Sequence, residues 1–195
     1  MTNYSNYRLP IPEANLLASL IGIEQDLCGV ISYCDFLLGN TEIMRLNPLV
    51  REAVSVAAVI RYARCFLKGV RGNLENNLLD GNEELSQDHN YFILLRNKHF
   101  AHSVNPFEEN EVTVQIADHF TLAQEITTIN SFHKRVLGLS LADTALLKRL
   151  AEAVLDNVKA TMKQEKIRLL PLVKARQLEE LKSYGLECAP KTEQI

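Results

Sequence analysis

The stretch LLRNKHFAHS, residues 94–103, gathers an arginine, an asparagine, a lysine and two histidines within ten positions of a chain that has five histidines in all. A histidine with a pKa near neutrality can take the proton from a 2'-hydroxyl of RNA, or deliver one to the leaving 5'-oxygen. An arginine can stabilise the extra negative charge that develops on the phosphorane. The segment therefore predicts a site that cleaves an RNA phosphodiester without a metal ion.

Each polar residue of this stretch has a place in such a reaction. His102 is the candidate general acid or base, Arg96 stabilises the transition state, and Asn97 orients the phosphate or the imidazole. His99 shares a helix face with Arg96, and Lys98 is a candidate phosphate ligand. One copy of the chain supplies too few groups for efficient work on both sides of the phosphate, so we expect two copies to meet. The alternative is that each histidine is only a favourable charge near a helix C-terminus.

A second cationic feature precedes this stretch. Between Glu52 and Glu75 the chain has no acidic residue, and its four cations there are Arg61, Arg64, Lys68 and Arg71. At about 100° per residue these four share an arc of about 80° on one helix face, opposite an apolar face. We call them the basic stripe. It predicts a phosphate-binding surface; the alternatives are a solvated face and a face that meets acidic groups of another helix or subunit.

Composition limits these predictions. With 195 residues, 47% of them hydrophobic, the chain fits one globular domain, and its net charge of -3 means that RNA must be held by a local cationic patch. The four cysteines lack metal-ligand spacing, so we expect reduced thiols, no metal and no cofactor. No signal-peptide pattern is present, and no apolar run approaches the roughly 18 residues that span a bilayer. These features predict a cytoplasmic protein with no membrane contact.

Apolar residues recur at three- and four-residue spacing over most of the chain, which is typical of amphipathic helices. Helices are expected over about 13–39, 47–69, 86–102, 121–138 and 141–170, and Pro171 ends or kinks the last of them before a charged tail helix. Residues 111–118 alternate apolar and polar side chains, which predicts a short strand. Its partner is open: a second copy, an extended N-terminal stretch, or none if the segment is a loop.

The sequence therefore predicts an all-α fold, an up-and-down bundle of four to five main helices with a short strand-like excursion after the third helix. A single domain is expected over residues 1–195, with a core over about 10–165 and a C-terminal helical extension over about 166–195.

RNKHFAH, an arginine followed by a polar residue and by a histidine six positions after the arginine, resembles the signature of the HEPN superfamily. These are the "higher eukaryotes and prokaryotes nucleotide-binding" helical domains. The segment LRNKHFAHS is most similar to the bacterial AbiU2-like branch, as is the preceding segment AAVIRYARCF, residues 57–66. The resemblance covers about residues 10–165. It places the family arginine at Arg96, the polar position at Asn97 and the histidine at His102, and it transfers nothing to His99.

The resemblance implies a helical bundle, a homodimer with the motifs of two copies in one cleft, and metal-independent endoribonuclease activity that leaves 2',3'-cyclic phosphate ends. It also implies a setting in toxin-antitoxin, abortive-infection or other phage-defence systems, with RNA as substrate and an antitoxin or defence-system protein as a partner. The alternative is a catalytically inactive HEPN-like module that binds a nucleotide or a protein. A transcription regulator whose basic stripe contacts DNA comes last, because no turn-linked recognition helix is evident.

Overall fold

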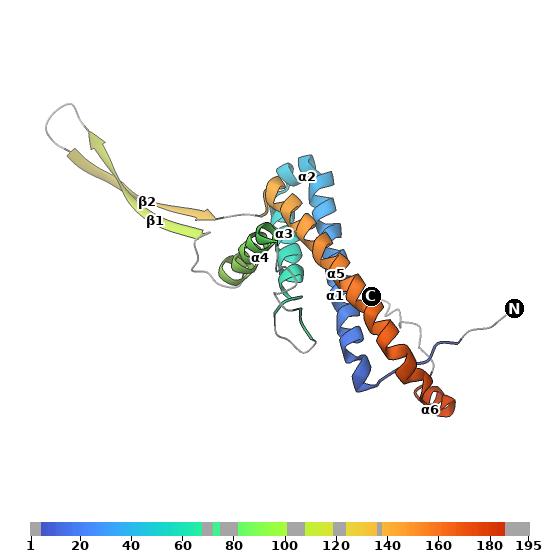
Figure 1. The fold of residues 1–195 in the computed structure, drawn as a ribbon. Helices are drawn as coiled ribbons and strands as arrows, with labels where there is room; N and C mark the ends of the chain where they lie inside the picture. Colours follow the sequence, from blue (N-terminus) through green and yellow to red (C-terminus); the bar gives the residue numbers. More distant parts are fainter. Residues whose placement is uncertain are drawn as a thin grey trace.

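The computed structural model describes residues 5–67, 72–74, 82–100, 108–118, 124–135 and 138–185. Two long antiparallel helices lie side by side along the molecule (Figure 1). The first is α1 (Asn15–Gly39), which follows the short 3-10 turn η1 (Pro12–Ala14), and the second is α5 (Leu141–Lys174). The short α2 (Thr41–Leu46) leads from α1 to α3 (Pro48–Ala63), which packs against both long helices.

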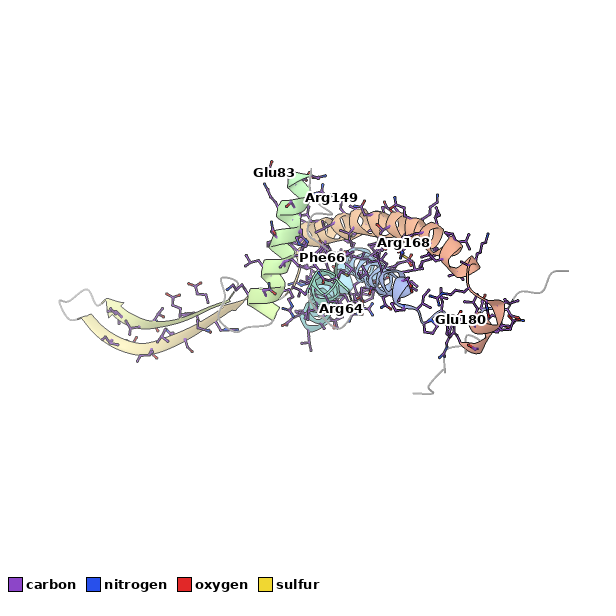
Figure 2. The ribbon with its side chains drawn as sticks, turned by 60° about the horizontal axis from the view of Figure 1, so that its bottom comes forward. Arg64, Phe66, Glu83, Arg149, Arg168 and Glu180 are labelled. Atoms are coloured by element: carbon purple, nitrogen blue, oxygen red, sulfur yellow. The ribbon has the colours of Figure 1, made fainter. Side chains whose placement is uncertain are left out.

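Helix α4 (Glu83–Leu95) contacts both α3 and α5 near one end of the bundle, and it continues directly into η3 (Arg96–Phe100), a π-helical turn. Figure 2 shows Arg149 of α5 at the junction with α4. One Nη of Arg149 donates to Glu84 at 2.7 Å and to Asp88 at 2.9 Å, so it bridges two carboxylates on successive turns of α4. This ion-pair cluster holds the N-terminal half of α4 on α5.

The core lies where α1, α3, α4 and α5 face one another. Buried side chains recur at helical spacing along α1 and α5, which explains why both long helices form and why they pack together. The largest fully buried side chains are Tyr62, Phe92, Ile23, Leu27, Leu95, Leu147 and Leu150. The start of α5 is fixed by a capping box, in which Ser140 Oγ accepts from the Asp143 N–H while Asp143 Oδ2 accepts from the Ser140 N–H.

The structure overturns the predicted all-α class. Helices make up 72% of the residues that it describes, but β1 (Glu108–Asp118) and β2 (Gln124–Arg135) form a two-stranded antiparallel sheet. The strand expected over 111–118 is present, and its partner lies within the same chain. The helix expected over 121–138 is wrong, because the β-branched run Ile126–Ile129 belongs to β2 and pairs with β1. The fold is mostly α, with one long hairpin.

Three helix boundaries also differ from the expectation. Helix α3 ends at Ala63 rather than near residue 69. Helix α4 starts at Glu83, three residues earlier than expected, because Asn82 caps it by accepting from the Leu85 N–H at 3.1 Å. Helix α5 continues through Pro171 to Lys174, and only then does the tail helix α6 (Leu178–Ser183) follow. A proline in the last turn of a 34-residue helix removes one hydrogen bond without ending the helix there.

By length and composition alone, one helix over Pro12–Gly39 could cross a membrane, with a mean hydropathy of 1.3 in its most apolar window. This differs from the expectation that no segment is long and apolar enough. In the structure the same helix supplies buried residues to the core against α3 and α5, and the core helix of a globular protein meets the same criterion. The finding is therefore weak evidence for a membrane segment.

A buried polar pair lies inside this core. Tyr62 on α3 and His89 on α4 are 0% and 3% exposed, and the Tyr62 hydroxyl is 2.8 Å from His89 Nδ1. The ring of Phe66 also lies against His89, at a centroid distance of 4.4 Å. His89 is thus a core histidine with a hydrogen-bond partner, and its burial lowers the pKa of its imidazole. The neutral imidazole holds α4 on α3.

This pair predicts an acid-sensitive fold. Because the pKa of His89 is lower in the folded than in the unfolded chain, its contribution to stability is complete above the unfolded pKa and is lost as pH falls through the folded pKa. We expect the melting temperature to fall by a few degrees more for wild type than for His89→Gln between about pH 7.5 and about pH 5. The exposed His133→Gln serves as a control and should keep the wild-type difference. An equal fall in wild type and His89→Gln would exclude His89 as the cause.

Candidate functional site

The candidate catalytic stretch lies where α4 changes geometry. From Arg96 to Phe100 the backbone leaves the α-helical pattern and forms the π-helical turn η3. Such turns are rare in proteins, and they occur frequently at functional sites because they widen the helix and redirect its side chains. The turn coincides with RNKHF, the first five residues of the motif.

Two motif side chains are tied together in this turn. Arg96 Nη1 donates to Asn97 Oδ1 at 2.9 Å, and both residues are half-buried, whereas Lys98 is exposed. The side chain of His99 and the whole of His102 lie outside the described residues. The structure therefore places Arg96, Asn97 and Lys98 on one turn, and it leaves the position of the two histidine side chains as a prediction.

Helix α3 supports this turn. His89 of α4 packs on Tyr62 of α3 and on Phe66, which lies just past the end of α3. Phe92, one turn later in α4, packs on Tyr62. The C-terminal end of α4 therefore lies beside an earlier part of α3. The turn η3, just beyond Phe92, in turn contacts α3. The motif consequently rests on the helix that carries Arg61 of the basic stripe and ends just before Arg64.

Those two cations converge on one buried carboxylate of α1. Asp26 is 2% exposed and accepts two hydrogen bonds from Arg64, with Arg64 Nε 2.7 Å from Asp26 Oδ2 and the second bond joining Nη2 to Oδ1. Arg61 Nε lies 3.8 Å from the same Oδ1. The hydrogen bond to Asp26 raises the pKa of the Arg64 guanidinium. Two positive charges therefore share one negative charge at the α1–α3 contact.

Arg61 is held in place by α1 as well. Its Cζ lies 5.5 Å from the centre of the Tyr33 ring, a cation–π geometry. The guanidinium also occupies the space beside Gly29, where the Cβ of any larger residue would collide with Arg61 Nη1. The glycine thus permits the close approach of Arg61 to α1. The side chains of Arg61 and Arg64 remain 39% and 53% exposed, so both still face solvent.

Sequence reasoning did not single out Asp26. It is an acid within an apolar stretch of α1, and its partner Arg64 lies 38 positions later. Its helical spacing could have predicted its burial, because Asp26 lies on the same helix face as the core residues Ile23, Leu27 and Val30. Of the alternatives for the basic stripe, Arg61 and Arg64 match a face that meets an acidic group of another helix. Lys68 and Arg71 fall outside the residues that the structure describes.

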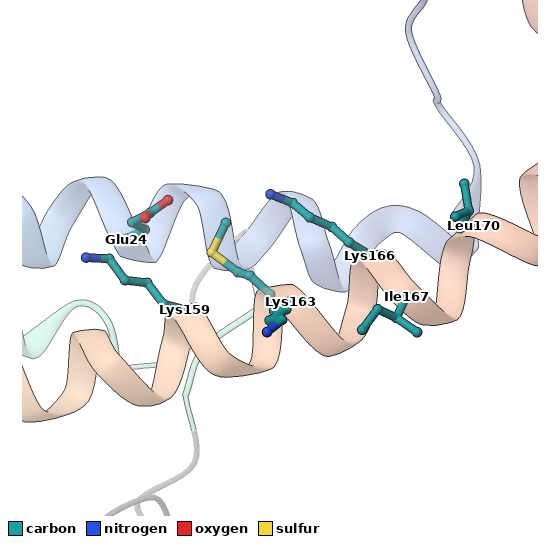
Figure 3. A pocket seen from close by; sticks show the side chains of 7 residues that line it. Glu24, Lys159, Lys163, Lys166, Ile167 and Leu170 are labelled. Carbon is teal, nitrogen blue, oxygen red and sulfur yellow. The ribbon is translucent and has the colours of Figure 1, made fainter.

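A cationic groove between α1 and α5 was also missed. Figure 3 shows Lys159 and Lys166 of α5 on the side that faces Glu24 of α1. These residues and Lys163 line a pocket of about 420 Å³ together with apolar side chains of α5. The spacing of the lysines by four and three residues was the available signal, since such residues share one helix face. Surface lysines alone do not define a ligand site.

A second pocket, of about 310 Å³, lies near the start of α5. Arg45 and Arg51 line it, together with Glu42, Ser140 and apolar side chains. Glu42 pairs with Arg45 at 2.7 Å, whereas the Nε of Arg51 is buried and makes no hydrogen bond in the described part of the chain. Neither this pocket nor the cationic groove is lined by a motif residue.

The described residues offer no metal site, and the buried thiol of Cys34 is unreactive. Among them no group of three or more His, Cys, Asp or Glu side chains is placed to hold a metal ion. Cys28, Cys34 and Cys65 are not joined in disulfides, and burial raises the pKa of the Cys34 thiol to about 12. At neutral pH Cys34 is therefore protonated and a poor nucleophile.

The contacts of Arg61 and Arg64 with Asp26 predict that this carboxylate contributes to the stability of the fold. Replacing Asp26 by Asn keeps the shape but removes the charge that Arg61 and Arg64 share. We expect the free energy of unfolding to fall by about 1–3 kcal/mol, less than for a fully buried pair because both arginines are partly exposed to solvent. Urea unfolding would measure the loss from the shift in the midpoint at constant slope.

The same helix offers a matched control. Asp35 pairs with Lys148 of α5 at 2.6 Å but is 54% exposed, so Asp35→Asn should cost no more than about 0.5 kcal/mol. Equal losses in the two variants would contradict a special role for Asp26.

Comparisons with known proteins found no match to this chain. No family model matches it, no curated protein matches it, and no solved structure matches it. The likeness to the HEPN superfamily consequently rests on the residues of the motif and of the helix before it.

Proposed function

We propose that the protein is a homodimeric, metal-independent endoribonuclease of the HEPN type, with its site at the end of α4, in a toxin-antitoxin or abortive-infection system. The observation that carries the proposal is the π-helical turn at Arg96–Phe100, which coincides with the motif. A rare backbone geometry at the residues singled out by their chemistry supports a functional rather than a structural role for them.

The described side chains suit the binding of a phosphate. An arginine has five N–H donors, and the hydrogen bond from Arg96 to Asn97 uses one of them. The remaining donors can meet the oxygens of a phosphorane, while the contact with Asn97 restricts the guanidinium to a few orientations. The Asn97 amide N–H groups can donate to the same phosphate because the hydrogen bond to Arg96 uses only the amide oxygen.

Arg61 and Arg64 can hold the RNA backbone near this site. Asp26 neutralises one of the two charges, so the pair retains a net positive charge on partly exposed side chains. Their fixed positions lower the entropy that is lost when a phosphate binds. In the proposal Lys98, Lys68 and Arg71 add further phosphate contacts, and His99 assists the proton transfers of His102.

The homodimer follows from the chemistry. Cleavage requires a base at the 2'-hydroxyl and an acid at the leaving 5'-oxygen, on two sides of one phosphate. With His102 as the only histidine in the motif position, two copies that meet at the site supply one histidine for each side. The partner in this proposal is a second copy, with an antitoxin or defence-system protein as regulator.

A second candidate is a catalytically inactive HEPN-like module that binds a nucleotide or a protein. One observation favours it: the motif residue Arg96 is engaged by its neighbour Asn97, as in a purely structural contact. Arg64 also donates two hydrogen bonds to Asp26 within the bundle, and Arg61 lies at ion-pair distance from the same carboxylate. In this alternative the motif maintains the end of α4 and performs no chemistry.

The proposal predicts cleavage of RNA in excess EDTA. Wild type and His133→Ala, which removes an exposed histidine hydrogen-bonded to Asn110 on the hairpin, should cut a mixed RNA and leave 2',3'-cyclic phosphate ends. His102→Ala and Arg96→Ala should lower the rate by about 10²- to 10⁴-fold, because each removes a group that acts in the transition state. Analysis of the product ends by mass spectrometry checks the mechanism.

Two results would contradict the ribonuclease. One is the absence of cleavage by folded, dimeric wild type, which favours the inactive module. The other is cleavage that His102→Ala retains in full, which points to a contaminant or to another site.

A further inference from the structure

The hairpin β1–β2 extends away from the helical bundle (Figure 1). It carries apolar side chains that are exposed to solvent. Their exposed fractions are high for aliphatic residues. They are Val112 at 74%, Val114 at 54%, Ile116 at 49%, Ile126 at 66% and Ile129 at 68%.

These five side chains lie on one face of the hairpin. Residues that pair directly across two antiparallel strands point to the same side, and here Val114 pairs with Ile129 and Ile116 pairs with Ile126. The opposite face carries the polar pairs Thr113 with Asn130 and Gln115 with Thr128, and its one large apolar side chain among the described residues is Phe132, which pairs with Glu111. We call the five aliphatic residues the apolar face.

A β-bulge is responsible for completing this face. Between the pairs Gln115–Thr128 and Ile116–Ile126, Thr127 is an extra residue on β2, and its Oγ1 donates to the Gln115 carbonyl at 3.1 Å. Without the extra residue Ile126 would point to the polar face, because side chains alternate along a strand. The bulge instead brings Ile126 to the side of Ile129. The chain thus concentrates its aliphatic residues on one side of an exposed hairpin.

An uncovered face of this kind is unfavourable for a single molecule. A two-stranded hairpin is at best marginally stable in water unless a third element packs on it. Exposed aliphatic patches that are bordered by polar residues are typical of interaction surfaces. We therefore expect a partner to cover the apolar face.

The charges of the hairpin argue against a polyanion as this partner. Its two strands contain five acidic residues and two basic ones, as read from EENEVTVQIAD and QEITTINSFHKR. Nucleic acid or an anionic lipid surface would be repelled by such an arm. The five members of the apolar face are uncharged, so two such faces can meet without opposing like charges.

We propose that the apolar face is where two copies of this chain meet, hairpin against hairpin, about a two-fold axis. A two-fold axis brings the same patch of both subunits together, and an aliphatic patch is complementary to itself. At about 100 Å² for each of the five exposed side chains, the two copies would bury about 1,000 Å² in total, which reaches the lower limit of a specific interface. Stacked face to face, the two hairpins form a small four-stranded sandwich.

This surface is independent of the ribonuclease chemistry, but it bears on the dimer that the proposed function uses. In this proposal the two copies associate through their hairpins. The end of α4 with Arg96 is then not part of the hairpin contact and stays available for the proposed ribonuclease site.

The test is the mass in solution of the full chain at tens of micromolar, by light scattering and sedimentation equilibrium. Wild type should be a dimer. Val114→Asp combined with Ile129→Asp should be monomeric with unchanged helical circular dichroism, because it places charges in the apolar face. Thr113→Asp combined with Thr128→Asp adds the same charges to the polar face and should remain dimeric.

A second pair of variants tests the interface without adding charges that could unfold the hairpin. Val114→Cys should be joined to its copy by a short bismaleimide in higher yield than Thr113→Cys, which lies on the other face in the same background of native cysteines. A monomeric wild type, or a dimer that survives the charges in the apolar face, would overturn this interface. Absence of RNA cleavage in EDTA by a wild type that is dimeric contradicts the ribonuclease and not the hairpin contact.

Discussion

The buried carboxylate of Asp26 is the interaction on which the arrangement of the helices depends. Removing a carboxylate from water costs several kcal/mol, which only well-placed partners offset. Here Arg64, at the C-terminal cap of α3, supplies two hydrogen bonds, and Arg61 of α3 supplies a second positive charge. The cost of burial therefore fixes the position of α3 on α1. It also determines which way the basic side of α3 faces, because the two arginines must reach the same oxygen atoms.

The consequences pass from α3 to the motif. Tyr62 lies one residue after Arg61, and its hydroxyl meets His89 of α4 inside the core. Phe92 packs one turn further along α4, and the π-helical turn begins four residues later at Arg96. The end of α4 is thus placed by the core contacts of α3, while Arg149 holds its other end on α5. A chemically active turn at this place has a rigid support, which is what catalysis by positioned groups requires.

The sequence predicted the long helices because their apolar residues repeat at helical spacing, and it failed at β2 for a specific reason. Ile126, Ile129 and Phe132 are three residues apart, which is also typical of a helix face. In the structure the bulge at Thr127 puts Ile126 and Ile129 on one face of a strand, and Phe132 pairs with Glu111 on the other. An added residue in a strand can thus imitate helical periodicity. The spacing of these three residues could not reveal their strand partners, which lie 10, 15 and 21 positions earlier in the chain.

The candidate site was predictable in part. The chemistry of residues 94–103 drew attention to the end of α4, where the backbone changes to a π-helical turn. The turn itself has no sequence signature that periodicity can detect. Asp26 also escaped, because a contact between residues 38 positions apart is decided by packing. The roles of His99 and His102 remain predictions from their chemistry.

The central claim is that His102 moves protons in the cleavage of RNA while Arg96 stabilises the phosphorane. The measurement that tests it most directly is the rate of cleavage of a short RNA in excess EDTA as a function of pH, from about pH 5 to about pH 9. The account predicts a bell-shaped profile for wild type, because one histidine must be neutral and the other protonated, and it predicts the loss of that profile in His102→Ala. A rate that only rises with pH, or a profile that His102→Ala leaves unchanged, would contradict it.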